Sequence, residues 1–279
     1  MNDPWKSARR PSARPPRATP TPPAGERPNA GVVRGSDELR LHGVNAVQAM
    51  FAKRPQALRK LYLVEAMIGP LQPLLKWCVA NRVGYRVVEE GDLNKLAATT
   101  HHEGVVADVA KVEPLSLAAW LDALPAGPAM ALWLDGVGNP HNFGAILRSA
   151  AHFGVSAILL PAESSLALSG AAARVAEGGA EAVQLVRLPV AAQAQAQLRE
   201  AGFGLGATVV AGGASVFQTA LPPRLVYVMG AEGEGMDREF ARNCDLQLSI
   251  PGTGEVESLN VAAATAVFLA SWRAQQVRA

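Results

Sequence analysis

The sequence predicts an α/β fold, with a mostly parallel sheet in the C-terminal part of the chain and a small α/β domain before it. After residue 129, short apolar runs alternate with helix-like stretches, as in a parallel sheet covered on both faces. Of the 279 residues, 49% are hydrophobic and 18% are charged, which is sufficient for a large core. The expected strands of this sheet are residues 132–134, 157–160, 183–186, 208–210, 226–229 and 246–250.

Residues 1–38 are predicted to form a disordered tail, because they contain eight of the twenty prolines and few large apolar side chains. The tail carries seven Lys or Arg against four Asp or Glu, whereas the rest of the chain carries 19 and 20. A basic segment of this kind can contact RNA phosphates, and it is also typical of a solubilising extension.

The small α/β domain is predicted to span residues 39–110, and a linker rich in proline and glycine is predicted at 111–128. The larger domain then occupies residues 129–279. In the small domain we expect helices at 44–53, 71–81 and 93–98 and strands at 61–64, 85–88 and 105–109.

Several classes of protein are excluded by composition. Cys78 and Cys244 lie far apart, so the sequence predicts neither a disulfide framework nor a metal site. No apolar run reaches the roughly 18 residues of a membrane span, and the N-terminus lacks the apolar core of a secretory signal. The sequence therefore predicts a cytoplasmic protein without a membrane span.

Three loops that follow expected strands carry the candidate chemistry. The first, residues 134–150, runs from a strand end at Asp135 into a helix that we expect Asn142 to cap, with Arg148 about two turns into that helix. The second, residues 229–236, places Glu232 among glycines that let the backbone approach a ligand. The third, residues 250–261, leads into an apolar helix that we expect Ser258 to cap. Each loop alone is also compatible with a capped helix or an ordinary turn.

Together, the three loops resemble the SpoU family, also called the TrmH family, of RNA ribose 2′-O-methyltransferases in the SPOUT superfamily. The matching motifs are N-P-x-N-x-G-A-x-x-R at 139–148, G-x-E-x-x-G at 230–235 and I-P…S-L-N-V at 250–261. Residues 43–47 and 101–107 resemble the two ends of the L30e-like RNA substrate-binding domain that often precedes this catalytic domain. Relatives usually carry Gln in place of Glu103, and many carry Met in place of Gly252.

The resemblance implies a trefoil knot in the C-terminal domain, S-adenosyl-L-methionine as the cofactor, rRNA or tRNA as the partner, and a homodimer formed through the knot domain. It assigns activation of the ribose 2′-hydroxyl to Arg148. An arginine has a pKa above 12, so we expect it to stabilise the developing alkoxide, although the family assignment leaves a role as base open. The residues expected to fix Arg148 and the substrate are Asn142, Glu232, Ser258 and Asn260, and those expected at the cofactor are Thr208, Gly230, Ile250 and Leu259.

Two other functions were weighed against this one. The chain could be a catalytically silent RNA-binding or assembly protein that retains the methyltransferase fold. A Rossmann nucleotide site is disfavoured, because the G-x-G-x-x-A pattern at 202–207 follows a helix-like stretch and leads into a strand.

Overall fold

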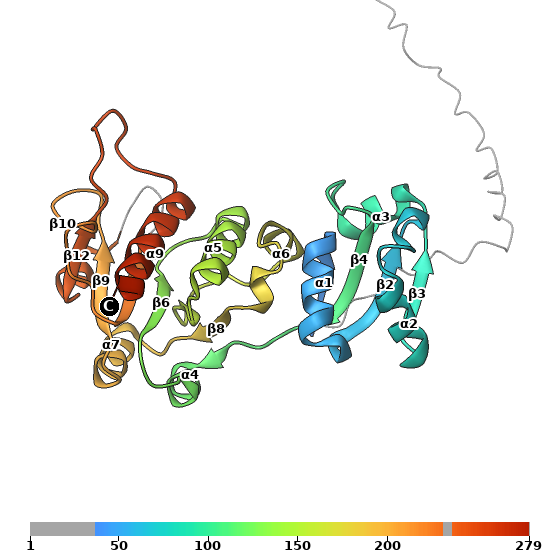
Figure 1. Ribbon diagram of the computed structural model, residues 1–279, viewed down its shortest axis with the longest axis horizontal. Helices are drawn as coiled ribbons and strands as arrows, with labels where there is room; N and C mark the ends of the chain where they lie inside the picture. Colours follow the sequence, from blue (N-terminus) through green and yellow to red (C-terminus); the bar gives the residue numbers. More distant parts are fainter. Residues whose placement is uncertain (1–36, 231–235, 279) are drawn as a thin grey trace, which may run out of the picture. The chain divides into compact units, whose positions relative to one another are not determined.

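The computed structural model describes residues 37–230 and 236–278, so residues 1–36 of the predicted tail lie outside the described residues, whereas Glu38 already belongs to the first strand. Two sheets organise the described chain, and both are drawn in Figure 1. A four-stranded sheet comes first in the sequence and an eight-stranded sheet follows. Among the helices of these two ranges, none has the length and apolar character needed to cross a bilayer.

The four-stranded sheet has the order β1-β4-β2-β3, in which only the β2–β3 pair is parallel. Side chains alternate between its faces, so that Leu61 and Leu63 join the core under α1 and α2 while Tyr62 packs toward α3. The elements are β1 (Glu38–His42), α1 (Val44–Lys53), η1 (Pro55–Ala57), β2 (Leu58–Leu63), η2 (Glu65–Met67), α2 (Gln72–Ala80), β3 (Gly84–Val87), α3 (Glu90–Ala97) and β4 (Val105–Ala110).

The eight-stranded sheet has the order β10-β12-β9-β11-β6-β7-β8-β5, and all of its pairings are parallel. All six residues of the central strand β6 are buried, which explains why this strand appears in the sequence as an apolar run. The strands are β5 (Leu115–Ser116), β6 (Ala129–Leu134), β7 (Ala157–Leu160), β8 (Gln184–Arg187), β9 (Gly204–Thr208), β10 (Ala214–Ser215), β11 (Arg224–Met229) and β12 (Leu246–Ser249).

Helices cover both faces of this sheet. Phe143 of α5 and Phe268 of α9 belong to the core on one face, whereas Trp120 of α4 and Leu198 of α7 belong to the core on the other. The fold is therefore α/β with a parallel sheet, as predicted. The helices are α4 (Leu117–Ala123), α5 (Pro140–Phe153), α6 (Gly170–Val175), η3 (Gly179–Glu181), α7 (Ala191–Glu200), α8 (Arg238–Arg242) and α9 (Val261–Arg278).

One predicted strand was misplaced. Strand β9 ends at Thr208, whereas the expectation was a strand that begins there and continues to residue 210. Glycines occupy positions 204 and 206 of the strand, so it lacks the continuous apolar run that marks its neighbours. The two-residue strands β5 and β10 were not predicted, because two residues carry no periodicity.

Residues 169–181, here called the bridging segment, include α6 and η3 and contact both sheet regions. Ala173 of α6 is buried among the core residues of the four-stranded sheet. On the other side, α6 packs closely on α5: a Cβ added at Gly144 would lie 2.6 Å from the carbonyl oxygen of Ala172. The bridging segment thus contacts the four-stranded sheet and the helix that carries Arg148.

Candidate active site

The N-terminus of α5 forms the first part of the candidate site. The side chain of Asn139 caps the helix by accepting a hydrogen bond of 2.8 Å from the backbone N–H of His141, and Pro140 occupies the first helical position. The expectation that Asn142 is the cap was therefore wrong, because the helix begins two residues before it. The apolar face of α5 packs in the core, whereas the side chain of Arg148 is exposed.

A hydrogen bond joins the N-terminal ends of α5 and α9. The amide Nδ2 of Asn260 donates to Oδ1 of Asn142 over 3.1 Å, although the two residues are 118 positions apart in the sequence. The other end of the Asn260 amide, Oδ1, accepts from the backbone N–H of Ala262 at 2.9 Å and so caps α9. Ser258, the expected cap, instead lies exposed in the preceding loop.

Arg148 lies on the solvent side of α5, two turns after this junction. Within the part of the chain that the structure describes, its guanidinium forms no hydrogen bond or ion pair. The bridging segment passes close to its backbone, since a Cβ added at Gly179 would lie 3.1 Å from the Arg148 Cα atom. Five N–H donors are therefore available to an oxygen of a substrate.

Three of the four expected cofactor residues lie at one edge of the large sheet. Strands β12, β9 and β11 are neighbours, and Ile250, Thr208 and Gly230 lie at or directly after their carboxyl ends. In parallel sheets, this edge is where ligands bind. The Thr208 hydroxyl donates to the carbonyl oxygen of Val228 at 2.9 Å, so its proton is used within the sheet.

Leu259, the fourth expected cofactor residue, lies in the loop that precedes α9. The side chain of Leu259 is 48% exposed, and Val256 in the same loop is 69% exposed. These apolar groups lie next to backbone N–H and C=O groups, and a site for a purine ring combines both kinds of contact. Glu232 lies outside the described residues, so the structure does not place it.

Asp135 follows β6 at the same edge of the sheet. Its backbone N–H donates to the carbonyl oxygen of Met229 at 2.8 Å and so links the ends of β6 and β11. Burial raises the pKa of its carboxyl group, and the charges of Glu163 and Asp237 raise it further. The carboxylate of Asp135 therefore accepts a proton more readily than an exposed carboxylate does.

No group of His, Cys, Asp and Glu within residues 37–230 and 236–278 has the arrangement of a metal site. His102 is buried, its Nδ1 accepts from the backbone N–H of Gly104 at 3.0 Å, and its Nε2 lies 3.0 Å from Oδ1 of Asn94. His102 thus stabilises the turn that precedes β4.

The contact between the bridging segment and the four-stranded sheet was not predicted. Glu181 accepts two hydrogen bonds of 2.8 Å from the guanidinium of Arg54, and Glu103 forms an ion pair of 3.4 Å with Arg174. The second oxygen of Glu103 accepts from the backbone N–H of Val44 at the start of α1. In the sequence these residues resemble ordinary surface charges. The one local signal is Ser169, a residue type that often caps a helix and does cap α6.

His42 lies buried in this contact and makes its stability depend on pH. Burial lowers the pKa of its imidazole, Arg174, His102 and His101 lower it further, and Glu103 opposes them. The folded protein therefore binds the proton less well than the unfolded chain, whose histidine has a pKa of about 6.5. We expect stability to be full above about pH 6.5 and to be lost as the pH falls from there toward the lowered pKa.

Urea unfolding at pH 7.5 and pH 5.5 measures this effect, and His42→Gln should make the difference between the two pH values smaller. The matched control is His141→Gln, because His141 is exposed and is not among the groups that shift the pKa of His42. An equal pH dependence in the wild type and in His42→Gln would contradict the expectation.

Comparison with known proteins places these features in a family. Residues 129–270 match the model of the SpoU rRNA Methylase family, and residues 40–115 match a model described as RNA 2′-O ribose methyltransferase substrate binding. The chain is 37% identical to the uncharacterized tRNA/rRNA methyltransferase YfiF of Escherichia coli O157:H7, over 85% of this chain and 68% of that protein. It is 38% identical to the 23S rRNA (guanosine-2′-O-)-methyltransferase RlmB of Bordetella pertussis, over 82% of this chain and 94% of that protein.

Solved structures agree with these relatives. The structure of a putative RNA methyltransferase of the TrmH family from Porphyromonas gingivalis is 26% identical, covers 86% of this chain and 90% of its own, and has a TM-score of 0.68. An AdoMet-bound rRNA methyltransferase from Sinorhizobium meliloti has the same fold, with a TM-score of 0.71 at 24% identity, over 85% of this chain and 87% of its own. From the family model, the relatives and the fold together, the chain belongs to the SpoU rRNA methylase family.

Proposed function

We propose that the chain is an S-adenosylmethionine-dependent methyltransferase that acts on a ribose 2′-hydroxyl of structured rRNA or tRNA. The observation that carries this proposal is the hydrogen bond between Asn142 and Asn260, which joins the helix of Arg148 to the loop that ends at Leu259. This hydrogen bond therefore keeps the helix that carries Arg148 next to the candidate cofactor loop. The relative from Bordetella pertussis is named a guanosine-2′-O-methyltransferase, which supports the same reaction.

The cofactor, when bound, supplies a methyl group on a positively charged sulfur. In our proposal, backbone groups of Gly230 and Ile250 and the side chain of Leu259 hold it, with Thr208 beneath it. Arg148 donates hydrogen bonds to the 2′-oxygen as its proton leaves, and so stabilises the alkoxide. Because arginine stays protonated, the proton passes to a phosphate oxygen or to water.

The remaining site residues have supporting roles in this proposal. Asn142 and Asn260 hold the N-termini of α5 and α9 together, so they fix the direction in which α5 presents Arg148. Glu232 and Ser258 contact the substrate or the neighbouring loops. Ser258 is exposed, which leaves its hydroxyl accessible to a ligand.

We further propose the domain organisation that the sequence predicts. Residues 39–110 would be an L30e-like domain that binds the RNA substrate, and residues 129–279 the methyltransferase domain with the trefoil knot of the family. A homodimer through the knot domain is supported by α9, whose first ten residues, 261–270, include no charged side chain although Ala263 is exposed and Val267 only half-buried. A cytoplasmic location would bring the protein to its RNA.

The test is an assay of the purified protein with S-adenosylmethionine labelled in its methyl group and with separated ribosomal and transfer RNA. A ribose 2′-O-methyl group protects the adjacent phosphodiester from alkali, so we expect labelled, alkali-resistant dinucleotides. Label in mononucleotide bases, or no transfer to either RNA, would overturn the proposal. The absence of transfer together with the absence of cofactor binding in calorimetry would favour a catalytically silent RNA-binding protein instead.

A further inference from the structure

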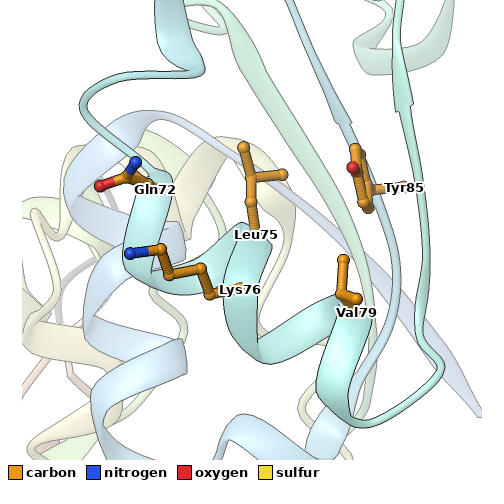
Figure 2. Close-up of a pocket in the computed structure, with 5 residues that line it drawn as sticks. All are labelled: Gln72, Leu75, Lys76, Val79 and Tyr85. Carbon is orange, nitrogen blue, oxygen red and sulfur yellow. The ribbon is translucent and has the colours of Figure 1, made fainter.

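A hollow of about 320 Å³ lies between α2 and the edge strand β3 (Figure 2). Its lining residues are Gln72, Leu75, Lys76, Val79 and Tyr85. Leu75 and Val79 lie one turn apart on α2, on the side of the helix that faces Tyr85 of the strand (Figure 2). Gln72 and Lys76, also one turn apart, form the polar rim.

The apolar part of this hollow is unusually accessible. Val79 is 66% exposed and Tyr85 is 41% exposed, whereas Leu75 beneath them is buried. The exposure follows from the topology, because β3 is the edge strand of the four-stranded sheet and all four of its residues are exposed. The side chain of Tyr85 therefore lines the hollow together with Leu75 and Val79 and stays accessible to a flat ligand.

Lys76 is the only charged residue among the five that line the hollow. Residues 66–88, which include α2 and β3, contain two further basic side chains, Arg82 and Arg86, and no Asp or Glu. All three are exposed, and none takes part in an ion pair within the described chain. Arg86 follows Tyr85 directly on β3, so its side chain lies on the face of the sheet opposite to the hollow.

We propose that this hollow binds an unpaired nucleotide of the RNA substrate. The base stacks on Tyr85 above Leu75 and Val79, Gln72 is placed to bond the base edge, and Lys76 neutralises a phosphate. An aromatic ring beside unpaired cations is the combination with which proteins hold single-stranded nucleotides. This inference rests on the proposed function, because it assumes that RNA is the substrate.

A protein ligand would suit the hollow less well. A second copy of the chain or another protein would have to bring a carboxylate to Lys76. RNA brings a phosphate with every nucleotide, so its charge complements the hollow whatever its sequence. Stacking is equally independent of sequence, because every base has a flat face.

The first experiment measures the binding of two fluorescein-labelled RNAs to the full chain by fluorescence anisotropy, without cofactor. One RNA is a hairpin with an unpaired loop, and the other is a fully paired duplex of the same length. We expect Tyr85→Ala to weaken binding of the hairpin by roughly 5- to 100-fold, the loss of stacking of one base, and to leave the duplex unchanged. Tyr85→Trp should keep the affinity for the hairpin, because it retains a stacking surface.

The second experiment tests the cation. Lys76→Ala should reduce the slope of log affinity for the hairpin against log salt concentration by about 0.7, the value for one phosphate contact with a single strand. The matched control is Lys95→Ala, which removes an equally exposed lysine that is paired with Asp92 on α3. It should leave the slope unchanged.

Equal hairpin affinity in Tyr85→Ala and the wild type would overturn the inference, as would a shift of the oligomeric state of Tyr85→Ala in sedimentation, which would make the hollow a protein contact. The thermal unfolding of each variant shows that it is folded. The binding assay requires no methyl transfer, so failure of this subsite is distinguishable from failure of the proposed function. If the wild type binds the hairpin but methylates no RNA, only the proposed function fails.

Discussion

Replacing Arg148 with alanine is expected to lower the rate constant of methyl transfer by about 100- to 1000-fold, the usual effect of removing one donor that stabilises a developing oxyanion. The affinity for S-adenosylmethionine should stay within about twofold, because the expected cofactor residues lie on the loops after β9, β11 and β12 rather than on α5. Single-turnover assays with saturating RNA measure the rate constant, and calorimetry measures the cofactor affinity.

The structure makes this variant easy to interpret. Arg148 is exposed and alanine is a good helix former, so the free energy of unfolding should change by less than about 0.5 kcal/mol. Arg148→Lys is the matched variant: it keeps the charge but loses the fork of donors, so we expect an intermediate rate. A full rate in Arg148→Ala would reject the role of this residue, whereas a weaker binding of cofactor with an unchanged rate constant would place it at the cofactor.

The parts of the fold that were predictable are those in which one local pattern decides the structure. Strand β7 and helix α1 have the predicted bounds, because an apolar run and a regular amphipathic repeat are complete within each of them. The start of α5 was predicted two residues late. Both Asn139 and Asn142 can cap a helix, and the sequence alone does not show that Pro140 is already helical.

The sequence motifs name candidate residues for the site but do not show their contacts. The pairing of Asn142 with Asn260 depends on how α5 and α9 pack, which is set by core residues on both helices rather than by either motif. The residue predicted to cap α9, Ser258, was also wrong. Serine is a common helix cap, yet Asn260 takes this role because the helix begins at Val261.

The bridging segment could not be predicted, because its partners are far away in the sequence. Arg54 and Glu181 are 127 positions apart and neither belongs to a motif. Glu103, which stands where relatives usually carry Gln, makes two contacts in the structure. Its carboxylate accepts from the N-terminus of α1 and pairs with Arg174, and the neutral glutamine that relatives usually carry would provide no ion pair.

The second prediction with a large effect concerns the ion pair of Arg54 and Glu181. Glu181→Ala is expected to lower the free energy of unfolding by about 3 kcal/mol, because it leaves the charge of Arg54 without its partner in a mostly buried place. The side chains of Arg54 and Glu181 are only 15% and 10% exposed, so solvent screens their interaction weakly. Arg54 also donates to the carbonyl oxygen of Ala110 over 2.7 Å, and this bond holds it at the site after Glu181 is removed.

Urea unfolding of Glu181→Ala, Arg54→Ala and the double variant separates the pair from its surroundings. If the two residues stabilise the protein through each other, the double variant should be less destabilised than the sum of the single variants, by about 1–3 kcal/mol. The matched control is Asp92→Ala at the pair of Asp92 and Lys95, whose side chains are 57% and 81% exposed. A pair so exposed contributes about 0.5 kcal/mol or less. Strict additivity at Arg54 and Glu181 would mean that this pair does not hold the bridging segment, and that its other contacts, such as the buried Ala173, do so.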